Sequence, residues 1–490
     1  MMGYRKDKVA IIGLDGASYS FIDILIKRSI AANMRALLNK DNTIIKILKS
    51  ILPPYTPPAW TSITSGVNPG KHGVYDFHIV EKSDKGFITR IATAFDVRYP
   101  RLHNMLSMHK LRSIIYNLPL TYPPWYLNDR YSIIINDWMA PEIRMHPQVL
   151  ERKYIDYFNK GLKALDLKGS KEESFKYMLE RLEWSTSGLL ELMEKYDWNL
   201  LFTVFSEVDW SLHGNIHIIN GDFIGRSREV FKKIDWFIGK VMEFTDNIIV
   251  VSDHGFTLCD YIINIPFILK SHGLIMEKLF TEALSLNILG KKIDIPSSLI
   301  RFTRKHKRIK TFARKLLFKL GGKAGKERRR EIPYKITKAL VPDAGIIYVA
   351  PGYKEKIKEI ISRDPYILRV YEPSEIYNGP YIDHAPDLIL EPKLDYCLGI
   401  STRCYKVEKV TSHHRDGVFI GHFADEELLM VLRKMNILKL WDIVPIVLKI
   451  LGLPLPNDTD SQLLKLLSTK TMNYSGRYRL IKRIQSIKSV

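Results

Sequence analysis

The chain contains little cysteine and no long hydrophobic run. Its three cysteines, Cys259, Cys397 and Cys404, form no CxxC pair and cannot build a disulfide framework, which fits a reducing compartment or no redox role. The most apolar late stretch, residues 437–455, is broken by lysine and aspartate, so no membrane span is expected. The N-terminal apolar run, residues 9–14, is too short for the core of a signal peptide. We therefore expect a soluble protein in the cytoplasm.

Excess positive charge is confined to two short segments. The net charge is +21, yet residues 301–330 hold 14 Lys or Arg against one acid, and residues 465–490 hold seven Lys or Arg and no acid. Together these segments carry 20 of the 21 net charges, so the rest of the chain is near neutral. A general nucleic-acid-binding surface would share its charge more widely, so we expect no specific nucleic-acid binding.

The first basic segment has the pattern of an amphipathic helix. Apolar residues recur at helical spacing across residues 299–320, with lysine or arginine between them. Two interpretations remain open. The helix could pack as part of an inserted subdomain, or it could bring the protein into peripheral contact with an anionic membrane surface.

The remaining composition favours a folded domain with a buried sheet. Hydrophobic residues make up 46% of the chain, and only 26% of residues are charged. Apolar runs over residues 9–15, 200–206 and 248–253 alternate with segments of helical periodicity. Shorter runs follow at residues 346–349, 388–390 and 418–420. The predicted fold class is α/β, with a mostly parallel central sheet flanked by helices.

Three aspartates follow the three long apolar runs. Asp15 and Asp253 come directly after a run, and Asp209 comes within four residues of one. His213 and His254 stand beside them. A single acid at such a position would most simply cap a helix or form a turn. Because the carboxyl ends of parallel strands meet at one edge of a sheet, the set together predicts a metal site there.

A threonine framed by prolines begins the next motif. Thr56 stands in the sequence PPYTPPAWTSITSG, residues 53–66, where a strand ends and a helix is expected to begin. The N-terminus of a helix offers N–H groups and a positive dipole to an anion, which suits a phosphoryl group held on Thr56. Proline in the first helical turn costs no hydrogen bond.

These motifs, in this order, resemble one known family. The chain is similar to the type I phosphodiesterase/nucleotide pyrophosphatases of the alkaline phosphatase superfamily, and in particular to a group of prokaryotic phosphohydrolases. The motifs that carry the resemblance are the first strand (residues 9–16), TPPAW with its continuation to GKHGV (56–74), EVDWSLH (207–213), VSDHG (251–255), SHHRDG (412–417) and the closing segment (442–460).

The resemblance implies an alkaline-phosphatase-like catalytic domain over residues 1–468. Two helical insertions are expected within it, at about residues 100–185 and 271–345, the second strongly basic. A basic C-terminal tail, residues 469–490, follows.

The resemblance also implies a nucleophile and two divalent metal ions. Thr56 would be the nucleophile. The metals would be zinc, with manganese as an alternative, since carboxylate and imidazole ligands suit both. The implied ligands of one metal are Asp15, Asp253, His254 and Thr56, and those of the other are Asp209, His213 and His414.

The chain departs from the family pattern at the substrate. Ala59 replaces an asparagine that holds a phosphate oxygen in nucleotide pyrophosphatases, so we expect the N–H of Ala59 or the hydroxyl of Thr61 to take its place. His413 and His414 are adjacent, and the H-R pair of the family motif selects His414, with His413 as the alternative. The C-x-P-x-R and S-x-P-x-R motifs of sulfatases do not occur in the sequence.

The predicted function is a metal-dependent phosphohydrolase of the phosphodiesterase or pyrophosphatase type. It would act on an organic phosphoester through a phosphothreonine intermediate. One alternative is a phosphoryl-group transferase acting on a lipid- or sugar-linked substrate. The other is a catalytically silent protein that binds anionic surfaces through its basic segments.

Overall fold

The computed structural model describes residues 8–126, 129–160, 171–275, 284–288, 291–295 and 330–488. A nine-stranded sheet forms its centre, in the order β21-β2-β20-β9-β1-β8-β5-β6-β7. The strands are β21 (Ile437–Lys439), β2 (Thr43–Lys49), β20 (Asp416–His422), β9 (Asn247–Val251), β1 (Val9–Leu14), β8 (Leu200–Phe205), β5 (Ser113–Tyr116), β6 (Ser132–Ile135) and β7 (Met145–His146).

The middle of this sheet is parallel. Strands β9, β1, β8, β5 and β6 run in the same direction, while β20 and β7 pair antiparallel with their neighbours. All six residues of β1 are buried, as expected for a strand covered on both faces. The prediction of an α/β fold with a mostly parallel central sheet is confirmed.

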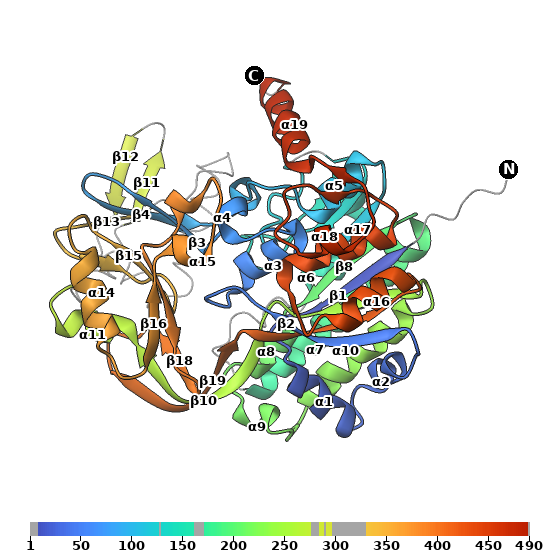
Figure 1. Ribbon diagram of the computed structural model, residues 1–490, viewed down its shortest axis with the longest axis horizontal. Helices are drawn as coiled ribbons and strands as arrows, with labels where there is room; N and C mark the ends of the chain where they lie inside the picture. Colours follow the sequence, from blue (N-terminus) through green and yellow to red (C-terminus); the bar gives the residue numbers. More distant parts are fainter. Residues whose placement is uncertain are drawn as a thin grey trace.

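Helices cover both faces of the sheet (Figure 1). Alternate residues of β1 enter different cores, with Val9 and Ile11 in one and Ala10 and Ile12 in the other. The first core contains residues of α3 (Thr56–Ser65), α5 (Leu102–Met108), α16 (Glu426–Lys434), α17 (Ile443–Ile450) and α18 (Leu463–Leu466). The second contains residues of α1 (Tyr19–Lys27), α2 (Ala32–Leu38), α6 (Gln148–Asn159), α7 (Lys171–Lys195), α8 (Glu207–Leu212), α9 (Ile216–Ile219) and α10 (Ser227–Val241).

A smaller, mostly antiparallel region stands beside the central sheet (Figure 1). One of its sheets has three strands, β18 (Tyr396–Gly399), β10 (Gly255–Asn264) and β19 (Lys406–His414). Another has four, β14 (Ala339–Leu340), β15 (Ile346–Val349), β17 (Leu388–Pro392) and β16 (Ile367–Tyr371), packed with α11 (Ile265–Ser271) and α14 (Lys354–Ser362). The apolar runs at 346–349 and 388–390 therefore belong to an antiparallel sheet, because they pair with each other and not with the central strands.

Short elements complete the described chain. They are β3 (His78–Lys82), β4 (Gly86–Ile91) and β13 (Arg330–Pro333) in one sheet, the pairs β11 (Leu284–Ile288) with β12 (Lys291–Ile295) and β22 (Leu455–Pro456) with β23 (Thr471–Met472), and the helices α4 (Pro69–His72), α15 (Pro373–Ile376) and α19 (Tyr474–Lys488).

The two expected insertions have different outcomes. Residues 100–185 supply β5, β6 and β7 to the central sheet, so this segment is partly a component of the main fold. Its strands have only two to four residues, too few for a clear sequence pattern. The basic amphipathic segment, residues 299–320, lies outside the described residues. In the basic tail, residues 474–488 form α19.

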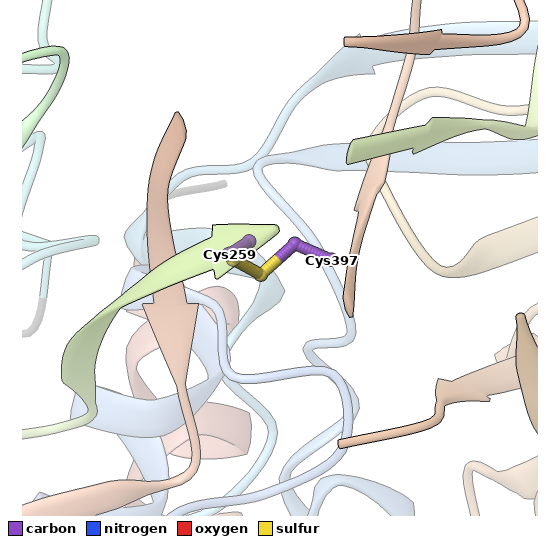
Figure 2. The surroundings of a disulfide bond; sticks show 2 residues. All are labelled: Cys259 and Cys397. Atoms are coloured by element: carbon purple, nitrogen blue, oxygen red, sulfur yellow. A yellow bond between two sulfur atoms is a disulfide. The ribbon is translucent and has the colours of Figure 1, made fainter. Parts of the chain in front are cut away.

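Two of the three cysteines are paired, although the sequence pattern indicates no disulfide framework. Cys259 on β10 and Cys397 on β18 form a disulfide, with their Cα atoms 6.0 Å apart (Figure 2). They are 138 residues apart in sequence, and the parallel pairing of β10 with β18 brings them together. The cysteine content therefore no longer supports a reducing compartment. Within the described residues, none of the helices is both long and apolar enough to cross a membrane.

Candidate active site

Three buried aspartates meet at the carboxyl edge of the central sheet. Asp15 follows β1, Asp253 follows β9, and Asp209 lies in α8, which follows β8. Since β1 pairs with both β8 and β9, the three side chains reach the same edge. Their residues are 1%, 0% and 9% exposed, respectively.

His254 lies among the first group of ligands. Its Nε2 is 3.3 Å from Asp253 Oδ2 and 3.6 Å from Asp15 Oδ1. The hydroxyl oxygen of Thr56 lies 3.4 Å from the same nitrogen. The other ring nitrogen, Nδ1, lies 3.2 Å from the carbonyl oxygen of Gly255, and a nitrogen bonded to a carbonyl carries the ring proton. The lone pair of Nε2 therefore faces the two carboxylates, in the form that binds a metal.

A second group forms around Asp209. Its Oδ1 lies 3.4 Å from His213 Nε2 and 3.2 Å from His413 Nε2. The Nδ1 of His413 lies 3.1 Å from the carbonyl oxygen of Pro54, which places the ring proton there and leaves Nε2 facing Asp209. The ring of His413 stacks on that of His254 at a centroid distance of 4.0 Å, so the two groups adjoin.

Strand β19 turns only one of its two adjacent histidines toward this site. Successive side chains of a strand point to opposite faces. His413 shares its face with Thr411, whose hydroxyl accepts the N–H of Gly214 at 3.0 Å. His414 instead accepts the N–H of Asp416 through Nδ1 at 3.2 Å. The structure therefore brings His413, and not the expected His414, beside Asp209, because the motif gives the order of residues but not which way the strand faces.

Helix α3 places Thr56 at its first position. The preceding residue, Tyr55, is extended and caps the helix. The helix packs closely on β1: a Cβ at Gly13 would lie 2.5 Å from the ring of Trp60, so glycine is needed at that strand position. Trp60 is fully buried and packs edge-on against Phe202, which makes it a core residue. This packing fixes the helix end that carries Thr56.

The first turn of α3 offers fewer hydrogen-bond donors than expected. The two residues after Thr56 are prolines, which have no N–H. The N–H of Ala59 donates to the carbonyl oxygen of Tyr55 at 3.0 Å, and the hydroxyl of Thr61 donates to that of Pro57 at 2.6 Å. The two groups that were expected to donate to substrate, Ala59 N–H and the Thr61 hydroxyl, therefore donate within the helix. The N–H of Thr56, at the helix start, has no acceptor inside the helix and can face a phosphoryl oxygen.

One family covers these motifs. A sequence model described as type I phosphodiesterase/nucleotide pyrophosphatase matches residues 9–416. The chain belongs to this family. It is therefore a phosphoester hydrolase of the alkaline phosphatase superfamily, as the sequence analysis predicts.

Solved structures of two enzymes have a similar fold. Phosphonoacetate hydrolase from Sinorhizobium meliloti 1021, in complex with phosphonoformate, is 12% identical with a TM-score of 0.56, covering 91% of this chain and 96% of that one. Murine ectonucleotide pyrophosphatase/phosphodiesterase 5, an inactive form in complex with AMP, is 11% identical with a TM-score of 0.53, covering 94% and 100%. No curated protein sequence matches the chain. At these identities the structural likeness shows the fold.

The carboxylates of this family member fit a bound cation. Asp15 Oδ1, Asp209 Oδ1 and Asp253 Oδ2 are buried and have no hydrogen-bond partner in the described part of the chain. Burial, and then the charges of Asp253 and Asp209, raise the pKa of Asp15 well above its usual range. Burial also raises the pKa of Asp253, although the N–H of Gly16 opposes this. Divalent cations would supply the missing positive charge and the missing partners.

The charge on Asp209 has a different origin. Burial raises the pKa of Asp209, but attraction to His213 and then to His413 outweighs burial, so the pKa of Asp209 lies below its usual range. The same attraction, against burial, raises the pKa of His213. The second group is therefore a carboxylate held between two imidazoles, a donor set that suits zinc.

His72, in the GKH motif, supports the nucleophile helix. Its Nδ1 accepts the N–H of Val74 at 3.2 Å, and its Nε2 lies 3.0 Å from Ser62 Oγ on α3. Burial lowers the pKa of His72 to about 3, so the ring stays neutral near pH 7. The residue links α4 to α3 and does not reach the ligands described above.

Sequence reasoning missed one acidic residue near the second group. Asp343, in the turn between β14 and β15, accepts the N–H of Ala344 at 2.8 Å. Burial, and then the charge of Asp76, raise the pKa of Asp343 to about 6, while His413 lowers it in part. No motif marks Asp343, since it lies in the segment that the sequence analysis assigns to an insertion.

Proposed function

We propose that this enzyme is a metal-dependent phosphohydrolase that cleaves organic phosphodiesters or pyrophosphates through a phosphothreonine at Thr56. The observation that carries the proposal is the position of the Thr56 hydroxyl. It lies at the N-terminus of a buried helix, 3.4 Å from a histidine that stands between two groups of buried ligands.

Two divalent ions, zinc or alternatively manganese, are proposed to bind at these groups. Asp15, Asp253, His254 and Thr56 would hold one, and Asp209, His213 and His413 the other. When bound, such ions lower the pKa of a coordinated hydroxyl and neutralise charge on the phosphoryl oxygens.

The residues of the chain then have separate roles in the reaction. Thr56 Oγ1 loses its proton and attacks the phosphorus, its P–O bond forms as the bond to the leaving oxygen breaks, and the leaving oxygen takes up one proton, so that no net proton is gained or lost. The N–H of Thr56 and the positive end of α3 face the phosphoryl oxygens. A water molecule then attacks the phosphothreonine, releasing phosphate or a phosphomonoester and restoring the hydroxyl.

The family supports hydrolysis as the reaction. The family is described as phosphodiesterase and nucleotide pyrophosphatase, and a structure of similar fold is a hydrolase of phosphonoacetate. The silent-binding alternative is less favoured, because both ligand groups keep a full set of carboxylates and imidazoles around the threonine.

A substrate panel tests the proposal. The enzyme should be treated with a chelator and then assayed on bis(p-nitrophenyl) phosphate and on p-nitrophenyl phosphate, with and without added Zn²⁺ or Mn²⁺. The proposal expects no turnover after chelation, recovery with metal, and a faster rate on the diester. Full turnover by the chelated, metal-free enzyme would exclude it.

A further inference from the structure

The C-terminal helix α19 is held to the body through one face. Tyr474 and Tyr478, one turn apart, are 0% and 3% exposed. The hydroxyl of Tyr474 donates to the carbonyl oxygen of Pro454 at 3.0 Å and lies 2.9 Å from His109 Nε2. Farther along, the ammonium group of Lys482 lies over the ring of Tyr478 at 5.3 Å. This face accounts for the attachment of the helix.

The other side of α19 exposes apolar side chains. Leu480, Ile481 and Ile484 are 58%, 36% and 45% exposed. Leu480 and Ile484 lie one turn apart, so they form a stripe turned away from the tyrosine face. A surface helix normally packs its apolar stripe against the core of the protein. In α19 the tyrosine face packs against the body instead. Figure 1 shows α19 projecting from the rim of the molecule. Folding alone therefore does not explain the stripe.

The charge of α19 is entirely positive. Residues 474–488 contain five Lys or Arg and no Asp or Glu. Arg477 and Arg479 are exposed, as is Arg483, so basic groups share the solvent side of the helix with the apolar side chains. An exposed stripe of leucine and isoleucine within a purely basic helix is the pattern of a helix that lies in a lipid headgroup layer.

We propose that α19 docks the enzyme on an anionic lipid bilayer. Leu480 and Ile484 would enter the boundary between headgroups and acyl chains, while the arginines contact lipid phosphates. A second copy of this helix fits less well, because two helices with only positive charge repel each other. A nucleic acid would attract the charges but would leave the leucine and isoleucine in water. The proposal does not depend on which phosphoester the enzyme cleaves.

Vesicle flotation of the full chain tests this docking. Phosphatidylcholine vesicles with and without phosphatidylglycerol are compared at low and at high salt. The wild type should float with the anionic vesicles only, and less so at high salt, because exposed charges are screened. Leu480→Ser combined with Ile484→Ser should lower the partition coefficient about tenfold or more, since two apolar side chains lose their burial. Arg477→Gln with Arg479→Gln should also lower the partition coefficient, and by a larger factor at low salt than at high salt.

A matched variant controls for the loss of exposed apolar groups in general. Leu368→Ser with Leu394→Ser replaces two leucines that are 61% and 79% exposed and lie outside α19, so its flotation should equal that of the wild type. Circular dichroism and thermal melting check that every variant is folded. The proposal is overturned if the variant Leu480→Ser with Ile484→Ser floats as well as the wild type. It is also overturned if the wild type does not bind anionic vesicles at all. If vesicle binding persists when α19 is changed, the contact belongs to another segment of the chain.

Discussion

His413 Nε2 lies 3.1 Å from His213 Nε2, and both nitrogens face the same carboxylate oxygen of Asp209. The Nδ1 of His413 faces the carbonyl oxygen of Pro54, so its ring proton lies there and its Nε2 presents a lone pair to this point. A carboxylate oxygen and two imidazole nitrogens at these distances form a donor set that zinc takes in proteins. We therefore propose this point as one of the two metal positions.

The first prediction separates the two adjacent histidines of β19. His413→Ala should remove one of two bound metal ions, because it deletes a ligand nitrogen of the second group. His414→Ala, the matched control, should keep both ions, because this side chain lies on the other face of the strand. Metal content per chain by mass spectrometry measures both. We expect kcat/KM to fall by more than the ~10- to 100-fold that outer partners of a metal site cost. Loss of metal in His414→Ala alone would reverse the assignment.

Much of the site could be predicted from sequence because the relevant residues follow strands. An apolar run that ends in aspartate fixes both the strand and the edge to which the acid points, as for Asp15 and Asp253. The position of Thr56 at a helix start was also predictable, since proline in the first turn marks it.

Other features depend on contacts that sequence order does not contain. The direction of His413 depends on the phase of β19 against β10, and adjacent histidines leave that phase open. The hydroxyl of Thr61 binds a carbonyl within its own helix, which motif position does not reveal. The partnership of Cys259 with Cys397 requires the pairing of two strands distant in sequence.

A second prediction concerns the stability of the metal-free enzyme. Burial raises the pKa of Asp253 above its usual range, so folding favours its protonated form. A carboxyl of this kind stabilises the fold below its unfolded pKa and loses that contribution as the pH rises through the folded pKa. Asp253→Asn removes the ionisable group and keeps an oxygen for the N–H of Gly16.

Chelated wild type should therefore lose thermal stability as the pH rises above about 4, the pKa of an aspartate in the unfolded chain, and chelated Asp253→Asn should lose less. Near pH 8 the variant should melt several degrees higher than the chelated wild type. With metal restored the order should reverse, because the variant has lost a ligand charge. Parallel melting curves of the two chelated proteins across this range would count against the buried-charge explanation.

A third prediction uses the neutral histidine of the GKH motif. Burial lowers the pKa of His72 to about 3, whereas the unfolded chain would protonate it near 6.5. A depressed histidine pKa gives stability that is complete above the unfolded pKa and is lost as the pH falls toward the folded pKa. The loss should approach about 1.4 kcal/mol for each pH unit below 6.5. Urea unfolding of wild type and His72→Gln from neutral to acidic pH should show the extra acid dependence in the wild type alone. Equal slopes would mean that His72 does not cause it.

A fourth prediction concerns the disulfide between β10 and β18. Oxidised, unfolded protein should react with a thiol reagent at one cysteine, Cys404, and reduced protein at three. Cys259→Ala with Cys397→Ala should lower the free energy of unfolding by about 2–4 kcal/mol, since the bond closes a long loop in the unfolded chain. Cys404→Ala serves as the control and should change stability little. Three reactive thiols in the unfolded but never reduced protein would rule out the bond.

The proposed mechanism depends most on Thr56 as the nucleophile. Thr56→Ala should keep the carboxylate and imidazole ligands and their metal ions, yet lose turnover of bis(p-nitrophenyl) phosphate by about 10³-fold or more. Thr56→Ser, which retains a hydroxyl, should recover part of the rate. The deciding measurement is mass spectrometry of the acid-quenched enzyme during turnover. We predict one added p-nitrophenylphosphoryl group, the part of the diester left when one nitrophenol departs, on the peptide that contains residue 56 in the wild type, and none in Thr56→Ala. Undiminished turnover by metal-loaded Thr56→Ala, or a phosphoryl group on a different residue, would contradict the account.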